Sequence, residues 1–189
     1  MTTITTTVES PVGPLTLTAS EGKLTGVAMR DQRHAPAPSK DWIRDDEWFT
    51  EVAAQLAAYF AGELTTFDVP MNLVGTEFQR NVWSRLTEIP YGTTISYGEL
   101  ARRVGNPLAS RAVGLANGRN PVAIIVPCHR VIGTNGDLTG YGGGLERKTW
   151  LLRHEASFRP SELLGALPAP NGRSLRGSKG TVRQTDVVT

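Results

Sequence analysis

The sequence predicts a mixed α/β protein whose first part is rich in strands and whose second part is helical. Short β-branched stretches separated by Pro and Gly turns fill the first 30 residues. Apolar residues at helical spacing recur in the later parts of the chain. We therefore expect an α/β (α+β) fold, with a supporting part over residues 1–74, a second part over 75–156 and a flexible tail over 157–189.

The strands of the first part are expected at residues 4–9, 15–19 and 24–29. Pro and Gly residues separate them and predict tight turns at both junctions. Residues 31–41 are rich in Pro and in charged side chains, which indicates a loop.

A helix should follow this loop. Trp48, Val52, Leu56 and Tyr59 recur at helical spacing, and Gly62 stands where such a helix would end. Residues 67–73 are expected to form one more strand.

The second part begins with a helix over residues 76–89, with Phe78, Val82 and Leu86 expected on its apolar face. The turn at 90–92 ends it. The S-x-x-E pattern from Ser96 to Glu99 is that of a capping box, which predicts a helix running to about residue 104.

A second short helix is expected after the break at 105–107, running to about residue 117 with Gly118 as its stop. Two short helices joined by a tight Gly-containing turn are typical of a helix-turn-helix. Farther on, the apolar run 123–126 indicates a buried strand, and the turn at 135–136 indicates a hairpin between 131–132 and Leu138. A final helix is expected over 145–155.

Composition narrows the function classes. The net charge is +2, which permits nucleic-acid binding without demanding it. The chain has one cysteine, so neither an internal disulfide nor a zinc site built on several thiolates can form. A reduced, cytoplasmic location is expected. We find no secretory signal and no stretch long enough to span a bilayer, and we expect no membrane contact.

Cys128 is the focus of the expected chemistry. A thiol reacts as its thiolate, and at an ordinary pKa of about 8.5 only a small fraction is ionised at neutral pH. His129 and Arg130 follow directly and are candidates for raising that fraction. Adjacent residues of an extended segment point to opposite faces, so a water between Cys128 and His129 is more plausible than direct contact. Taken alone, such a cysteine is more often an inert packing residue.

Other candidate features are weak when considered one at a time. His129 suits a structural histidine equally well, and Glu155 near a helix end is usually a solvated charge. The Gly-rich stretch 139–144 admits a flat ring or a phosphate, but lacks the signatures of nucleotide-binding loops. Small residues on the second short helix suit either helix packing or close approach to DNA.

The spacing of these features together resembles that of the O6-alkylguanine-DNA alkyltransferases, also called methylated-DNA–protein-cysteine methyltransferases. The resemblance is close over residues 76–156 and loose before them. It is carried, in chain order, by Phe78-Gln79, Val82-Trp83, Ile89-Pro90-Tyr91-Gly92, Ser96-Tyr97, Arg111-Ala112-Val113-Gly114, Asn120-Pro121, Ile125-Val126-Pro127-Cys128-His129-Arg130-Val131, Gly140-Tyr141-Gly142-Gly143-Gly144 and Glu155.

This resemblance implies a small antiparallel sheet in an N-terminal α/β domain and a helical, winged helix-turn-helix-like C-terminal domain. It also implies catalytic roles. Cys128 accepts the alkyl group, His129 acts on the thiol through a water, and Glu155 holds the other ring nitrogen. Asn120 braces the turn near the thiol, and Tyr97 donates a proton to the departing guanine.

The resemblance further implies a DNA surface and a base pocket. Arg111 fills the gap left by the extruded base. The rest of the DNA-binding surface is formed by Ala112, Gly114, Asn117, Tyr97 and Arg130. The pocket residues are Val131, Tyr141, Gly142, Gly143 and Gly144. No metal and no organic cofactor is expected.

The expected activity is therefore DNA repair by a single, irreversible transfer from O6-alkylguanine in duplex DNA to Cys128, extending to O4-alkylthymine. We expect a monomer in solution that binds DNA cooperatively. Two alternatives stay open. A non-catalytic helix-turn-helix lesion sensor would bind altered DNA unchanged, and a cysteine hydrolase would use Cys128, His129 and Glu155 with turnover.

Overall fold

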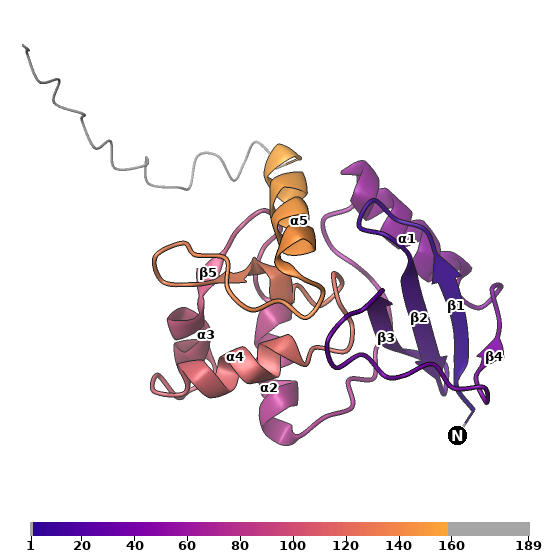
Figure 1. The fold of residues 1–189 in the computed structure, drawn as a ribbon, viewed down its shortest axis with the longest axis horizontal. Coiled ribbons are helices and arrows are strands. Elements are labelled where there is room, and N and C mark those ends of the chain that lie inside the picture. Colours follow the sequence, from indigo (N-terminus) through magenta and orange to yellow (C-terminus); the bar gives the residue numbers. More distant parts are fainter. Residues whose placement is uncertain (1, 159–189) are drawn as a thin grey trace, which may run out of the picture. The chain divides into compact units, whose positions relative to one another are not determined.

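A computed structural model describes residues 2–158, and its N-terminal part is a four-stranded sheet (Figure 1). The strands are β1 (Ile4–Val8), β2 (Leu15–Ser20), β3 (Lys23–Met29) and β4 (Ile43–Arg44), in the order β3-β2-β1-β4. The first three pair antiparallel, as predicted, whereas β4 pairs parallel to β1. Alternation places Leu15, Leu17 and Ala19 in the core, because successive side chains of a strand face opposite sides.

Helix α1 (Thr50–Ala61) lies against this sheet (Figure 1). It buries Val52, Leu56 and Tyr59, three of the residues whose spacing predicted it. Gly62 ends the helix with a positive φ of 78°, a conformation that glycine adopts without steric cost. The expected strand over 67–73 is not formed. Only Met71 makes an isolated bridge, to Leu24, because Pro70 removes a donor from this segment.

The second part begins with three helices: α2 (Glu77–Thr87), α3 (Tyr97–Arg103) and α4 (Ser110–Gly118). Helix α2 buries Val82, Trp83 and Leu86, but Phe78, expected on the same face, is 37% exposed. Helices α3 and α4 follow each other across a short break and pack together, as the helix-turn-helix prediction requires.

Capping explains where α2 and α3 begin. Thr76 and Gln79 form a complete capping box at α2, which the sequence analysis overlooked. At α3 the Ser96 hydroxyl accepts from the Glu99 backbone N–H, but the Glu99 carboxylate binds Arg102 and Arg103 instead of closing the box. The predicted box is therefore only half formed.

Two further strand predictions are wrong. Residues 123–126 form a buried turn, and the predicted strand is reduced to a bridge between Val27 and Val122. Strand β6 (Val131–Ile132) pairs parallel with β5 (Ile95–Ser96), so the expected hairpin with Leu138 is absent. Gly136 does turn with a positive φ.

The last described helix is α5 (Leu145–Ser157), which includes Ser157, the expected first residue of the tail. Residues 159–189 of that tail lie outside the described residues. One hydrophobic cluster spans both parts of the chain, from Leu15 in β2 and Tyr59 in α1 to Trp83 in α2 and Leu151 in α5. The division between residues 74 and 75 stays a prediction.

Candidate active site around Cys128

Cys128 is carried by a short 3-10 helix, Cys128–Arg130, directly after the buried turn. Backbone bonds from Ile125 to Ala123 and from Val126 to Val122 close this turn tightly. Ile124 has a φ of +71°, which is rare for a β-branched residue and breaks the extended conformation that the apolar run predicted. The turn thus replaces the strand and delivers the cysteine to the interior.

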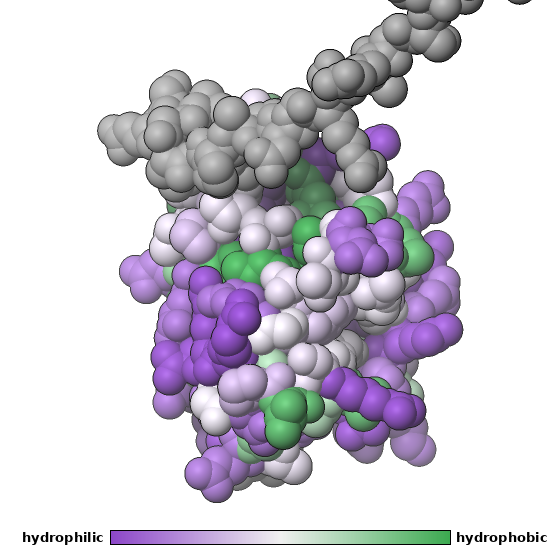
Figure 2. All heavy atoms as spheres, turned by 90° about the vertical axis from the view of Figure 1, so that its left-hand side faces the viewer, coloured by the Kyte–Doolittle hydropathy of each residue, from purple (hydrophilic) through white to green (hydrophobic). Residues whose placement is uncertain are grey.

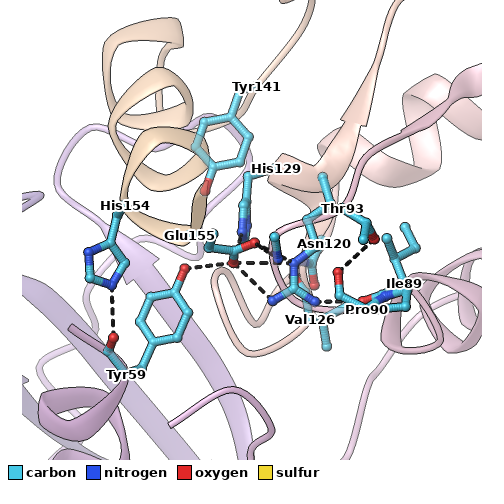
Figure 3. Close-up of polar contacts among 12 residues, drawn as sticks. Tyr59, Ile89, Pro90, Thr93, Asn120, Val126, His129, Tyr141, His154 and Glu155 are labelled. Carbon is cyan, nitrogen blue, oxygen red and sulfur yellow. Dashed lines mark hydrogen bonds and ion pairs between the residues drawn. The ribbon is translucent and has the colours of Figure 1, made fainter. Parts of the chain in front are cut away.

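Asn120 braces the turn from within. Its side-chain Nδ2 donates to the Val126 carbonyl at 2.8 Å and to the Val122 carbonyl at 3.3 Å, and its Oδ1 accepts from the Val122 N–H at 3.1 Å (Figure 3). The same Nδ2 lies 3.1 Å from the Cys128 Sγ. One buried amide therefore holds both the turn and the sulfur.

The Cys128 thiol is 5% exposed. Burial raises its pKa, because a thiolate loses hydration in the interior. The hydrogen bond from Asn120 and the positive charge of Lys148 act in the opposite direction and favour the thiolate. The resting group is therefore a protected thiol with two neighbours arranged to stabilise its anion.

Behind the thiol, the Glu155 carboxylate connects four parts of the chain (Figure 3). It accepts from His129 Nε2 at 2.8 Å, from the Tyr59 hydroxyl at 2.8 Å, from the Gly92 N–H at 2.9 Å and from the Arg130 guanidinium at 2.9 Å. Burial opposes its charge, but the hydrogen bond from His129 and the hydrogen bonds and charge of Arg130 prevail and hold the pKa of Glu155 far below its ordinary value. Glu155 is therefore ionised although its side chain is fully buried.

His129 is also fully buried. Burial lowers its pKa below the ordinary value, although Glu155 opposes this shift, so the imidazole is neutral at neutral pH. Because Glu155 accepts at Nε2, the single ring proton resides there and Nδ1 carries the free lone pair. Within the described residues Nδ1 has no hydrogen-bond partner. The orientation by Glu155 matches the expectation, and the water between Nδ1 and the thiol stays a prediction.

Arg130 does not lie where a DNA contact requires it. Its side chain is 7% exposed, pairs with Glu155 and donates to the Ile89 carbonyl at 2.6 Å. The resemblance implied a position on the DNA surface, but the Arg130 side chain is directed inward from the 3-10 helix. The structure therefore gives Arg130 a role in the buried ion pair in place of the expected DNA contact.

Lys148 is a site residue that the sequence analysis missed. It is fully buried, and its Nζ donates to the carbonyls of Val131 at 2.6 Å and Thr139 at 2.9 Å. Burial lowers its pKa to about 8, although the Cys128 charge opposes this. The signal was present, because Lys148 and Glu155 stand seven residues apart with Leu151 between them, which places all three on one helix face.

Tyr97 lies at the start of α3 with its ring facing Gly114 of α4. Its hydroxyl donates to the Thr139 carbonyl at 3.1 Å, and the Lys148 Nζ is 5.9 Å from the ring centroid. Burial and the Cys128 charge raise the pKa of Tyr97, despite contacts to Thr139 and Asn117. The phenol is therefore a protonated group close to the thiol.

Two cavities meet at the site. A narrow one of about 10 Å³ reaches the sulfur and is lined by Gln32, Asn117, Gly118, Asn120, Ala123, Cys128, Tyr141, Gly142 and Gly143. A wide one of about 490 Å³ opens beside it and is lined by Arg33, His34, Tyr97, Ser110, Arg111, Gly114, Leu115, Gly118, Thr139, Gly140, Tyr141 and Gly142. We call the second one the mouth cavity.

Only some of the predicted pocket residues line these two cavities. Tyr141, Gly142 and Gly143 line the narrow cavity. Gly143 has no room for a side chain, since a Cβ there would lie 2.5 Å from the Met29 Sδ. Val131 and Gly144 line neither cavity. Val131 is fully buried in β6, and Gly144 is an exposed residue at the N-terminus of α5, so their expected pocket roles are not supported.

The predicted DNA-contacting residues lie mostly on α4. Arg111 and Ala112 are exposed, Gly114 is half-buried, and Asn117 is buried against the thiol segment. The face that carries α3 and α4 is largely neutral at its centre, with strongly hydrophilic residues on either side (Figure 2). A surface of this kind lets a backbone come close at its centre.

The N-terminal loop contributes three lining residues that no sequence pattern pointed to: Gln32, Arg33 and His34. The Arg33 N–H donates to the Gly142 carbonyl at 2.9 Å. Arg147 of α5 donates to the carbonyls of Val12 and Gly143 at 3.0 Å. These bonds join the loop to the Gly-rich stretch that forms the pocket wall.

Within residues 2–158 two features are absent. No group of three or more His, Cys, Asp or Glu side chains lies close enough to bind a metal ion. No described helix has the length and apolar character needed to cross a membrane.

Comparison with known proteins supplies the family. Residues 3–73 match the 6-O-methylguanine DNA methyltransferase, ribonuclease-like domain, and residues 77–157 match the DNA binding domain of the same name. A methylated-DNA–protein-cysteine methyltransferase of Mycobacterium tuberculosis is 55% identical over 157 residues, which are 83% of this chain and 94% of that protein. One of Methanosarcina acetivorans is 56% identical over 150 residues, 79% of this chain and 96% of that protein.

Solved structures agree with this assignment. The crystal structure of Mycobacterium tuberculosis OGT in complex with DNA superposes with a TM-score of 0.79 at 54% identity, and the match covers 85% of this chain and 97% of that one. The mixed α/β fold, with its small sheet and helical second part, is therefore confirmed. The chain belongs to the 6-O-methylguanine DNA methyltransferase family.

Proposed function

We propose that this chain repairs DNA by taking the alkyl group of O6-alkylguanine onto Cys128, once per molecule. One observation carries the proposal: the buried Cys128 thiol has a hydrogen-bond donor on its sulfur and lines a narrow cavity that shares Gly118, Tyr141 and Gly142 with the mouth cavity on the α3 and α4 face. Family membership and the names of the relatives, methylated-DNA–protein-cysteine methyltransferases, agree with it.

The reaction is a displacement at the alkyl carbon. The Cys128 sulfur forms a bond to this carbon as the bond to O6 breaks. The thiol proton passes through a water to Nδ1 of His129, whose other nitrogen is held by Glu155. The departing guanine takes a proton from the neutral phenol of Tyr97, and the Lys148 charge supports the thiolate. Atoms and protons balance among the thiol, the base and these residues.

Product chemistry makes the protein a consumed reagent. A thioether, unlike an acyl-enzyme, has no easy route back to the thiolate. The reactive group must stay reduced until it is used, which suits a single cysteine in a reducing cytoplasm. We expect a monomer that acts on one lesion and stops.

DNA binding is proposed for the face of α3 and α4. The alkyl carbon is hidden in the duplex, so the nucleotide must rotate outward at a cost that poor pairing of the altered base reduces. The half-buried Gly114 and exposed Ala112 allow α4 to lie close to a groove, and Arg111 projects beside the mouth cavity to occupy the vacated stack. Phosphate contacts should make binding salt-sensitive.

The decisive experiment uses a short duplex with a single O6-methylguanine. Intact-mass analysis should show one methyl added per protein molecule, and peptide mapping should locate it on Cys128. The matched control is Cys128→Ser, which should bind the duplex and gain no methyl group. The same measurement on a duplex with a single O4-methylthymine tests the wider substrate range.

Other outcomes would support the alternatives. Binding of lesion DNA without modification of wild type would indicate a lesion sensor. Steady release of product over many cycles would indicate a hydrolase. Either result would refute the transfer reaction.

A further inference from the structure

One hydrogen bond joins the N-terminal part of the chain to the carboxylate that orients His129. The hydroxyl of Tyr59, in α1, donates to Glu155 Oε1 at 2.8 Å, although the two residues are 96 positions apart in the chain. The other donors to this carboxylate among residues 2–158 are His129, Arg130 and the Gly92 N–H, which all belong to the second part. Tyr59 is therefore the contact through which α1 can influence the histidine.

Tyr59 is held firmly in place. It is fully buried, and His154 Nε2 donates to its backbone carbonyl at 2.8 Å. The ring centroids of Phe67 and Tyr91 lie 5.4 and 5.9 Å from that of Tyr59. Burial and the charge of Glu155 raise the pKa of Tyr59 far above its ordinary value, so the hydroxyl keeps its proton. Glu155 thus faces a permanent donor in a fixed position.

Tyr59 and His129 share one oxygen atom of Glu155 (Figure 3). Oε1 accepts from the Tyr59 hydroxyl at 2.8 Å, from His129 Nε2 at 2.8 Å and from Arg130 Nη2 at 2.9 Å. A carboxylate oxygen offers about two lone-pair directions, so three donors compete for it. Each donor reduces the negative charge that the others meet. The Tyr59 hydroxyl therefore limits how strongly Glu155 can stabilise a proton on His129.

Resting on the function proposed above, we infer that Tyr59 is a positioning residue for alkyl transfer, whose hydroxyl holds Glu155 against His129 and keeps the imidazole in its neutral form. The imidazole must have a free lone pair on Nδ1 to take the Cys128 proton through a water. Without the hydroxyl, Glu155 presents more negative charge to His129 and favours the imidazolium ion, which cannot act as a base. The N-terminal part thus contributes to the proton transfer through α1.

The other ionisable groups near this pair keep one charge state below pH 7. The groups that face Glu155, His129 or Tyr59 are Arg130, Lys148, Tyr91, Tyr141, Cys128 and His154. Arg130 stays charged, and so does Lys148, whose pKa is about 8. The two phenols and the thiol stay neutral, because burial raises the pKa of each. His154 is the exception, and a measurement specific to His129 separates the two histidines.

The test follows proton uptake by His129 and methyl transfer over the same pH range. NMR of protein isotope-labelled at histidine reports the state of the His129 ring nitrogens, without DNA, from about pH 5 to 8. Transfer from a duplex with one O6-methylguanine is timed at the same pH values. In Tyr59→Phe, the midpoint of His129 protonation and the acid limb of the rate profile should both move up by about one pH unit.

Tyr91→Phe is the matched control. Tyr91 is a neighbouring buried phenol whose hydroxyl has no hydrogen-bond partner among residues 2–158, so its removal should leave the His129 midpoint at the wild-type value. A merely structural role for Tyr59 predicts a different pattern, in which Tyr59→Phe slows transfer by the same factor at every pH and leaves the midpoint unchanged. That pattern, or an equal shift in Tyr91→Phe, would overturn the inference.

A ring-fluorinated tyrosine at position 59, introduced through a suppressed stop codon, covers the case in which Tyr59→Phe does not fold. Fluorine makes the hydroxyl a stronger donor at nearly the same size, so the His129 midpoint should move down. An unchanged or raised midpoint would count against the role of Tyr59. Absence of methyl transfer by wild type would instead refute the proposed function, because the His129 midpoint is measured without substrate.

Discussion

The charged groups behind Cys128 and those in front of it are organised in opposite ways. Behind the thiol, Glu155, Arg130 and His129 are buried and bind one another. In front, the mouth cavity is lined by Arg33, His34 and Arg111, all exposed, and by no carboxylate. The difference suggests separate roles, in which the inner charges determine stability and orient His129 while the outer arginines are left to attract a polyanion.

The largest effect is expected from Glu155→Ala. This change leaves the Arg130 and His129 groups buried without their anion, and should reduce the free energy of unfolding by about 3–5 kcal/mol. Urea denaturation measures the loss, with Glu146→Ala, an exposed position on the same helix, as the control. The separation of inner from outer charges would be contradicted if added salt restored the stability lost in Glu155→Ala. It would also be contradicted if that loss were no larger than the loss in Glu146→Ala.

A second prediction concerns Lys148, which bridges the two regions. Its folded pKa of about 8 lies below its ordinary value of 10.5. Between these values the unfolded chain binds more protons than the folded protein, so the Lys148 contribution to stability rises with pH. Above pH 8, the free energy of unfolding of wild type should rise relative to that of Lys148→Met by up to about 1.4 kcal/mol per pH unit. Denaturation curves for both proteins from pH 7 to about 10 test this. A stability difference between wild type and Lys148→Met that stays constant with pH would exclude a lowered pKa of Lys148.

Tyr59→Phe gives a finer test of the inner network. It removes a buried hydroxyl that donates to Glu155 at 2.8 Å, and should cost about 1.5–3 kcal/mol. The control is Tyr91→Phe, because the Tyr91 hydroxyl is buried without a partner among the described residues, and its removal should be neutral or stabilising. Equal losses in the two variants would mean that ring packing, and not the bond to Glu155, sets the effect.

The smallest changes in stability are expected at the mouth cavity. Arg33→Ala and Arg111→Ala should unfold like wild type, yet each should weaken DNA binding and reduce the slope of log K against log salt by about 0.9 if one phosphate contact is lost. Fluorescence anisotropy at several salt concentrations measures the slope. Arg153→Ala, an exposed arginine on α5, is the control and should leave the slope unchanged.

Much of the fold follows from local sequence patterns. The strands β1 to β3, the helix ended by Gly62 and the two short helices arise from alternation, helical spacing and caps, which depend on neighbours in the chain. The run 123–126 was mistaken for a strand because a short apolar stretch is equally compatible with a buried turn. The Val126 carbonyl of this run and the Val122 N–H before it bind the Asn120 side chain, a role that only the folded structure reveals.

The candidate site was less accessible to sequence reasoning. Cys128, His129 and Glu155 were expected through a family resemblance, and the structure brings the latter two together at 2.8 Å. Arg130 was expected on the DNA surface through the same resemblance, and the sequence does not say that its side chain points inward to Glu155. Gln32 and Arg33 reach the site from about a hundred residues away, and no local pattern encodes that contact. Lys148 shows the opposite case, in which a readable helix spacing was overlooked.

Arg147 has a consequence for how this protein can be divided. Its guanidinium links carbonyls on both sides of the sequence boundary, at Val12 and Gly143, while Gln32 supplies one wall of the cavity at the sulfur. A fragment that began at residue 75 would retain every residue that touches the thiol from the C-terminal side and still lack that wall. Both halves therefore contribute residues to the reactive centre, and neither half contains the complete centre once the chain is cut.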